Sequence, residues 1–201
     1  MKLIKIVSKL IKEKLIREYY TYMGNNKIDN DQILSNIYDN SELKTIGTLD
    51  QYKKYIKTIF PNSKIKQIVY TQGKIEDIPG AGGIWLGDSK ENVISLTKST
   101  KPETIHKCLI NLIHPNTYDS FQHDYMGNLS DFEDKQHPRD YLKNKLLNQG
   151  YDGIRIEEDT WNDTTNDYFV TSEQYLVFEL KNIYCLGGNK DIIKFKKYIT
   201  N

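Results

Sequence analysis

The sequence is short of cysteine, of net charge and of long apolar runs, and each shortage excludes a class of protein. Only two of the 201 residues are cysteines, Cys108 and Cys185, which is too few for a disulfide framework. The formal net charge is +1, without the excess of Lys and Arg that an obligate nucleic-acid partner requires. No stretch approaches the ~20 apolar residues that span a bilayer, so we expect no transmembrane segment. These properties favour the reducing cytoplasm of a cell, or a particle assembled in it, as the setting.

An amphipathic helical pattern covers residues 1–24. Apolar residues recur from Leu3 to Ile16 at helical spacing, and basic residues occupy much of the opposite face. The pattern fits a helix that packs on its own domain or docks on a partner. A membrane-surface helix also fits the basic face, although the aromatic anchors of such helices are missing. Glu13 and Glu18 interrupt the positive charge and argue against a cleaved targeting sequence.

Residues 25–46 predict a polar linker with at most one short helix, and residues 47–201 predict one compact domain. Thr48 and Gln51 have the spacing of a capping box, which predicts the start of a helix that Pro61 ends. Strands outnumber helices and mostly follow one another without a helix between them, so the expected fold class is α+β. We expect strands at 65–70, 84–86, 92–97, 105–113, 154–157, 175–178 and 183–186, a helix at 138–148, and a closing helix capped by Asn189 with Ile192, Phe195 and Ile199 inward.

Three separate motifs identify a family. The first is Ile68–Gly73, and the second is Gly83–Ser89. The third joins Gly150–Ile154 to Glu173–Phe178 and Asn182–Gly187. In this order and spacing they resemble the ADP-ribosyltransferase-like domain of phage polyvalent proteins and related bacterial proteins. The resemblance spans most of the chain and implies a phage-encoded protein that acts in the host cytoplasm or belongs to the virion.

The resemblance implies a split β-sheet fold that holds NAD, the substrate, in a cleft and transfers ADP-ribose to a protein target. In the family the first motif holds the adenosine ribose and the nicotinamide amide. An aromatic ring of the second motif packs on the nicotinamide. The NAD-binding positions implied here are Tyr70, Thr71, Gln72, Gly73 and Trp85.

The catalytic positions implied by the resemblance are Glu173 and Gln174. Cleavage of the nicotinamide–ribose bond builds positive charge on the sugar, which a nearby carboxylate stabilises. The family's glutamate falls on Gln174, which is neutral, and its first-motif histidine falls on Thr71. Glu173 is adjacent, but in a strand its side chain points to the opposite face. Two functions stay open, namely an active transferase or NAD hydrolase, and a non-catalytic virion or interaction protein that keeps the fold.

The remaining polar groups suggest simpler roles. The acidic segment from Glu157 to Asp167 lacks the pattern of a calcium loop and suits a solvated hairpin tip. In transferases of this fold the segment before the catalytic glutamate contacts the target, so partner recognition is the alternative. His106 and His114 lie too far apart to share a metal, and no zinc-binding cysteine spacing occurs, so we expect no metal site. Both cysteines lie in apolar strand-like runs and are expected to be inert core thiols.

Overall fold

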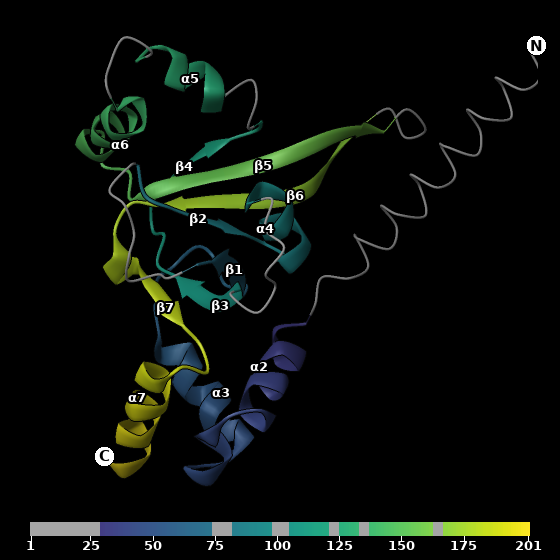
Figure 1. Ribbon diagram of the computed structural model, residues 1–201, viewed down its shortest axis with the longest axis vertical. Coiled ribbons are helices and arrows are strands. Elements are labelled where there is room, and N and C mark those ends of the chain that lie inside the picture. Colours follow the sequence, from purple (N-terminus) through teal and green to yellow (C-terminus); the bar gives the residue numbers. More distant parts are fainter. Residues whose placement is uncertain (1–28, 74–81, 98–104, 121–124, 133–136, 163–166) are drawn as a thin grey trace, which may run out of the picture.

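The computed structural model describes residues 29–73, 82–97, 105–120, 125–132, 137–162 and 167–201. Within them the chain is a mixed α+β protein built on one seven-stranded sheet, as expected for the fold class (Figure 1). Helices α2 (Asn30–Asp39), α3 (Leu49–Thr58) and α7 (Asn189–Thr200) gather at one end of the molecule, and α5 (Met126–Ser130) and α6 (Pro138–Asn148) lie at the other, with the sheet between them (Figure 1). The predicted helix at residues 1–24 lies outside the described residues.

The strands run in the order β4-β5-β6-β2-β1-β3-β7 across the sheet. All neighbouring pairs are antiparallel except β4 and β5, which are parallel. The two longest strands, β5 and β6, form a hairpin that projects beyond the others (Figure 1). The strand bounds are β1 Val69–Gln72, β2 Ile84–Gly87, β3 Ile105–Ile110, β4 Pro115–Tyr118, β5 Gly153–Asn162, β6 Asp167–Val177 and β7 Ile183–Cys185.

The backbone ladder of the sheet is shortest between β1 and β2. These strands share one ladder pair, Tyr70 opposite Gly87, whereas β1 pairs with β3 over four residues and β2 pairs with β6 over four. The Thr71 hydroxyl adds a side-chain link by donating to the Trp85 carbonyl oxygen at 2.9 Å. We call the strands on either side of this short ladder the two halves of the sheet, β4-β5-β6-β2 and β1-β3-β7.

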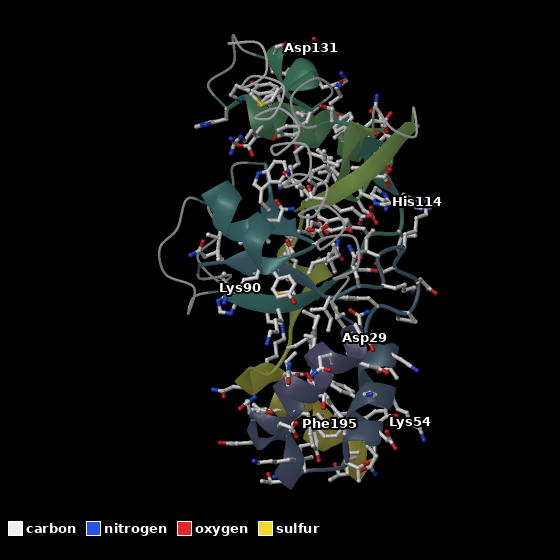
Figure 2. The ribbon with its side chains drawn as sticks, turned by 90° about the vertical axis from the view of Figure 1, so that its right-hand side faces the viewer. Asp29, Lys54, Lys90, His114, Asp131 and Phe195 are labelled. Carbon is white, nitrogen blue, oxygen red and sulfur yellow. The ribbon has the colours of Figure 1, made fainter. Side chains whose placement is uncertain are left out.

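Helices cover one face of the sheet, which we call the Trp85 face; it carries Tyr70, Trp85 and Gln174. Side chains alternate along each strand, so residues directly opposite one another on paired strands share a face. Helices α2, α3 and α7 pack over the β1-β3-β7 half, and α5 and α6 pack over the other half. Figure 2 shows Phe195 among the first group, at the end of the molecule opposite Asp131. The helix bounds are α2 Asn30–Asp39, η1 Glu42–Thr45, α3 Leu49–Thr58, α4 Lys90–Thr97, α5 Met126–Ser130, α6 Pro138–Asn148, η5 Leu180–Asn182 and α7 Asn189–Thr200.

The opposite face, which we call the Tyr175 face, has its own apolar core drawn from both halves of the sheet. Val69 and Cys108 come from one half, and Leu86 and Tyr175 from the other, and none of the four has measurable solvent exposure. Ile65, in the segment that leads from α3 to β1, packs against them. This shared core holds the two halves together where the backbone ladder is short.

A buried carboxylate fixes the turn into α7. Asp191 is fully buried, and its oxygens accept hydrogen bonds from the Tyr52 hydroxyl at 2.5 Å, the Tyr184 hydroxyl at 3.0 Å and the Gly187 N–H at 2.8 Å. Tyr55 extends the network, with its hydroxyl 2.6 Å from that of Tyr184. Burial raises the pKa of the Asp191 carboxyl, although the three donors act to lower it. The network ties α3, β7 and α7 into one unit.

The segment expected to be a polar linker differs from the structure at residues 30–45. It forms α2 and η1, and Ile33, Leu34, Ile37 and Leu43 are buried in the core with α3 and α7. The side chain of Asp29 accepts from the Asp31 N–H and caps α2. These residues therefore belong to the packed body of the protein.

Two local predictions were wrong. Residues 92–97 are helical rather than extended, because the Ser89 hydroxyl accepts from the Asn92 N–H and starts α4. Asn189 is the first helical residue of α7 and not its cap, which is Gly188. Asp191, two residues further on, binds the preceding turn instead.

Candidate functional site

The structure divides the predicted site residues between the two faces of the sheet. Tyr70, Gln72, Trp85 and Gln174 lie on the Trp85 face, because Tyr70 is opposite Gly87 and Gly87 is opposite Gln174. Thr71 and Glu173 alternate with these residues and lie on the Tyr175 face. Gly73 follows β1 in the left-handed region, with φ of +90°, and no heavy atom approaches the position of an added Cβ within 4 Å.

Gln174 and Tyr70 are separated on the Trp85 face by one glycine. Gly87 lies between them in the same row and has no side chain of its own above the sheet. Helix α4 approaches there instead: a Cβ added at Gly87 would lie 3.1 Å from a methyl of Val93 and 3.3 Å from Cβ of Asn92. The glycine thus lets α4 pack tightly between the two helix groups of this face.

Gln174 is a buried polar residue with an unsatisfied acceptor. Its residue exposure is 6 %, and its Oε1 has no hydrogen-bond partner among the described residues. A buried carbonyl oxygen that lacks a donor costs about 1–3 kcal/mol relative to a paired one. Native proteins pair nearly all such atoms, so this oxygen is an exception among the described residues, as is the buried Nε of Arg155.

Trp85 lies diagonally from Gln174 on the same face, since it is opposite Leu176 on β6. Its indole is half-buried and packs edge-on against Tyr125, with ring centroids 5.2 Å apart and planes at 89°. An edge-to-face contact fixes the orientation of the indole. The indole is therefore held by Tyr125, the residue directly before α5.

Thr71 is committed to the sheet itself. The residue is buried, and its hydroxyl donates to the Trp85 carbonyl across the β1–β2 junction. It faces away from Trp85 and Gln174, so its hydroxyl is not part of the group on the Trp85 face. The histidine expected at this position by the resemblance is replaced here by a residue that joins two strands.

Glu173 lies in a polar cluster on the Tyr175 face. Its carboxylate accepts from Arg155 Nη2 at 2.7 Å, from Gln67 Nε2 at 3.0 Å and from the Tyr175 hydroxyl. Arg155 also pairs with Glu157 at 2.7 Å through its other Nη atom. The Glu173 side chain is 15 % exposed, so this carboxylate is held in a well-satisfied and mostly buried ion pair.

The charges of this cluster shift their neighbours in consistent directions. The pKa of Tyr175 is raised, first by burial and then by the adjacent Glu173 carboxylate. Burial is the largest single influence on the pKa of Arg155 and lowers it, but the hydrogen bond to Glu173 and the charges of Glu173 and Glu157 together shift this pKa upward. Both shifts keep Arg155 charged and Tyr175 neutral.

Asp88, directly after β2, links the backbone of β6 to helix α4. Its Oδ2 accepts from the Glu173 N–H at 2.8 Å, and its Oδ1 accepts from the Asn92 side chain at 3.2 Å. Burial raises the pKa of its carboxyl, against the hydrogen bonds that lower it. By holding the backbone of residue 173, Asp88 sets which way Glu173 and Gln174 point.

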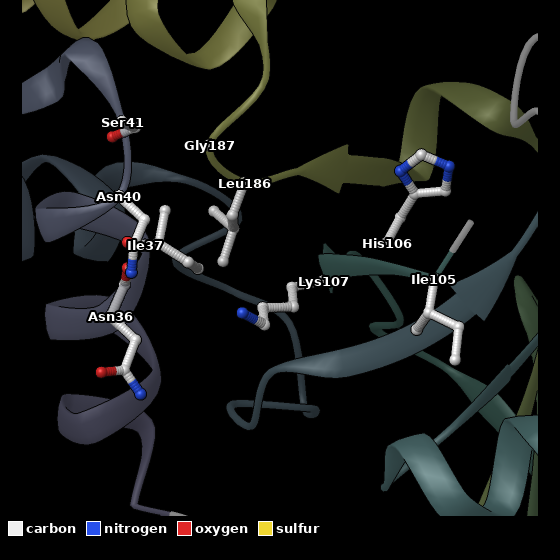
Figure 3. Close-up of a pocket in the computed structure, with 9 residues that line it drawn as sticks. All are labelled: Asn36, Ile37, Asn40, Ser41, Ile105, His106, Lys107, Leu186 and Gly187. Carbon is white, nitrogen blue, oxygen red and sulfur yellow. The ribbon is translucent and has the colours of Figure 1, made fainter. Parts of the chain in front are cut away.

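A surface pocket lies elsewhere and includes none of the predicted site residues. It has a volume of about 270 Å³ and lies between α2 and β3 (Figure 3). Lys107 extends toward α2, whereas His106 projects from the other side of the strand. The lining residues are Asn36, Ile37, Asn40, Ser41, Ile105, His106, Lys107, Leu186 and Gly187.

Sequence reasoning missed Gln67, Asp88 and Arg155. Each is a polar residue whose role depends on a partner distant in the sequence; Gln67, for example, bonds Glu173 and Tyr175. Arg155 alone carried a local signal, since a charged residue inside a predicted strand requires a partner on the same face. Asp88 lies in the second motif, but its spacing gives no hint of its bond to residue 173.

Comparisons with protein-family models, with curated proteins and with solved structures find no match for this chain. Among the residues that the structure describes, no group of three or more His, Cys, Asp or Glu could hold a metal ion. Within the same residues we find no helix with the length and apolar character needed to cross a membrane. Function is therefore argued from the geometry of the Trp85 face and from the sequence motifs.

Proposed function

We propose that this chain is an ADP-ribosyltransferase-like domain whose NAD site lies on the Trp85 face. The three sequence motifs that support the family all contribute strands to the sheet that carries this face. The first motif ends β1 at Gly73, the second forms β2, and the third forms β6 and β7. The single ladder pair between β1 and β2 supports a sheet divided at this point.

The observation that carries the proposal is the unpaired Oε1 of Gln174, buried beside α4 and diagonal to Trp85. An amide oxygen accepts a hydrogen bond from a ribose hydroxyl or from a carboxamide N–H. NAD offers both donors in its nicotinamide riboside half. Trp85 supplies an aromatic surface near the same point, and Gly73 opens the end of β1 for close approach of a ligand to the backbone.

The expected reaction breaks the bond between the nicotinamide ring and the ribose. Nicotinamide leaves with the bonding electron pair, and a nucleophile of the target protein binds the sugar carbon and loses its proton. Positive charge grows on the ribose during this step, and a preorganised negative group lowers the barrier. Gln174 orients the ribose but supplies no charge, so we expect turnover slower by roughly 10²-fold or more than with a carboxylate there.

The second candidate is a non-catalytic virion or interaction protein that keeps the fold. It is favoured by the state of Glu173, the nearest carboxylate in the third motif. That group lies on the opposite face and is bound by Arg155 and Gln67. No rotation of the side chain brings it to the Trp85 face while β6 keeps its pairing with β2 and β5. Under this candidate the chain binds a phage or host protein and does not cleave NAD.

One substitution separates the two candidates. The variant Gln174→Glu places a carboxylate on the Trp85 face at nearly constant volume. Thermal shift with NAD and nicotinamide release would be measured for the natural chain, for Gln174→Glu and for Gln174→Ala. Gln149→Glu makes the same chemical change at an exposed position after α6 and serves as the matched control.

We expect an NAD-dependent thermal shift in the natural chain, a smaller one in Gln174→Ala, and nicotinamide release at least ~10²-fold faster in Gln174→Glu. Gln149→Glu should behave like the natural chain. If the natural chain binds NAD without releasing nicotinamide, the non-catalytic candidate holds at the same site. The absence of any NAD-dependent shift in both the natural chain and Gln174→Glu would refute the NAD site.

A further inference from the structure

The two cysteines of the chain face each other across the edge of the sheet. Cys108 on β3 is directly opposite Cys185 on β7. The flanking backbone bonds run from Leu186 N–H to Lys107 O at 2.9 Å and from Asn111 N–H to Asn182 O at 2.8 Å. In an antiparallel pair this phase leaves 108 and 185 at a non-hydrogen-bonded position, where the Cα atoms are typically about 4.5 Å apart.

The spacing suits a covalent link between the two side chains. Both thiols are free, and their sulfur atoms are 3.2 Å apart. Disulfides in proteins join residues whose Cα atoms lie about 4.4–6.8 Å apart, a range that includes the non-hydrogen-bonded antiparallel pair. Adjustment of the two side-chain torsions brings the sulfurs to bonding distance without a shift in strand register.

The two thiols differ in access. Cys108 is fully buried in the core of the Tyr175 face, whereas Cys185 is half-buried on the last strand of the sheet. The pKa of Cys185 is lowered, first by the hydrogen bond between the two sulfurs and then by the charge of Lys190. The pKa of Cys108 is raised, first by that hydrogen bond and then by burial. Cys185 is therefore the thiol that reacts first.

We propose that Cys108 and Cys185 form a dithiol–disulfide couple that exchanges with low-molecular-weight disulfides of the glutathione type. The Cys185 thiolate attacks one sulfur of glutathione disulfide, whose S–S bond breaks and releases one glutathione thiolate. Cys108, after losing its proton, attacks Sγ of the mixed disulfide and releases the second glutathione. Two protein thiols are oxidised, one glutathione disulfide is reduced to two thiols, and the two protons end on glutathione.

The product joins the edge strand β7 to β3. The bond closes a loop of 77 residues in the chain, which restricts the unfolded state. It also links β3 to the turn that Asp191 holds at the start of α7. This proposal departs from the sequence-based expectation that both cysteines are inert, because each sulfur has the other as a neighbour.

The test uses the full-length chain, reduced and then incubated under native conditions with excess glutathione disulfide before acid quenching. We expect the intact mass to fall by about 2 Da, the loss of two hydrogens. Digestion without reduction should give one cross-linked peptide pair that contains residues 108 and 185. The oxidised protein should also have a Tm higher than that of the reduced protein by roughly 5 °C.

Single substitutions assign the order of attack. Cys108→Ala should accumulate a stable glutathione adduct on Cys185, whereas Cys185→Ala should react at least ~10-fold more slowly because its one thiol is buried. Circular dichroism verifies folding, and Cys108→Ser is the second variant if the alanine does not fold. The proposal is overturned if the natural chain keeps two free thiols, stops at the mixed disulfide, or forms only links between chains. A Tm that is unchanged or lower on oxidation overturns the stabilising role of the bond.

Discussion

Asp191 and Gln174 are both buried polar side chains, but only one of them is satisfied. The Asp191 carboxylate receives three hydrogen bonds, from Tyr52, Tyr184 and the backbone of Gly187. The Gln174 Oε1 receives none from the described residues. Asp191 lies in the first turn of α7, where it contacts α3 and β7. Gln174 lies on the face of the sheet that α7 covers, between the two helix groups.

Under the proposed function, the difference separates the structural role of Asp191 from the binding role of Gln174. A charged acceptor with three donors fixes the elements that supply them, and removal of any part leaves buried groups unpaired. An unpaired neutral acceptor fixes nothing, and folding proceeds despite it. The comparison predicts opposite responses to substitution at the two positions.

The largest expected effect is that of Asp191→Ala. It leaves the Tyr52 and Tyr184 hydroxyls and the Gly187 N–H without their acceptor, so the free energy of unfolding should fall by about 3 kcal/mol or more. Urea unfolding followed by circular dichroism measures the change. Asp50→Ala, at an exposed position in the first turn of α3, is the control and should change it by less than about 0.5 kcal/mol. A loss below about 1 kcal/mol for Asp191→Ala would show that the network contributes little.

A smaller effect is expected in the pH dependence of stability. Burial raises the pKa of Asp191 in the folded state above its unfolded value of about 3.9. Between these two values the folded state binds more protons than the unfolded state, so this carboxyl makes stability fall as pH rises. Asp191→Asn removes the titration. The stability of Asp191→Asn relative to the natural chain should therefore increase from pH 4 upward until it levels off above the raised pKa. A flat difference over this range would contradict the shift.

The smallest effect on stability is expected for Gln174→Leu. Replacement of an unpaired buried acceptor by an apolar group of similar size removes a desolvation penalty, so stability should be unchanged or rise by up to about 1 kcal/mol. The same variant should lose any NAD-dependent thermal shift. Urea unfolding with and without NAD gives both quantities. A loss of stability of 2 kcal/mol or more would mean that Gln174 has a structural role, and the NAD proposal would lose its main support.

Local signals predicted the elements whose ends are set by neighbouring residues. Thr48 and Gln51 form both bonds of the capping box, at 3.3 and 2.7 Å, and α3 starts where they place it. Pro138 begins α6 as predicted. The inward face of α7 was also correct: Phe195 is fully buried and Ile192 and Ile199 pack beside it. In these cases the interactions lie within a few residues, so one sequence window contains them.

The predictions failed where distant residues decide. The branched residues of 92–97 favour a strand, but the Ser89 cap starts a helix there, and this helix packs on β1, which is distant in the sequence. Residues 158–162 were expected in an acidic loop, yet they continue β5 because β6 pairs with them as far as Asn162 and Asp167. Pairing energy between strands outweighs a weak local preference.

The sequence alone determined that Glu173 and Gln174 point to opposite faces, because side chains alternate along any strand. It could not determine which face holds the helices or which residues meet there. The register of β6 with β2 and β5 places Gln174 with Trp85 and leaves Glu173 to Arg155. A shift of one residue in that register would exchange the two side chains. The apolar cores on both faces fix the register, and they form only when the whole chain has folded.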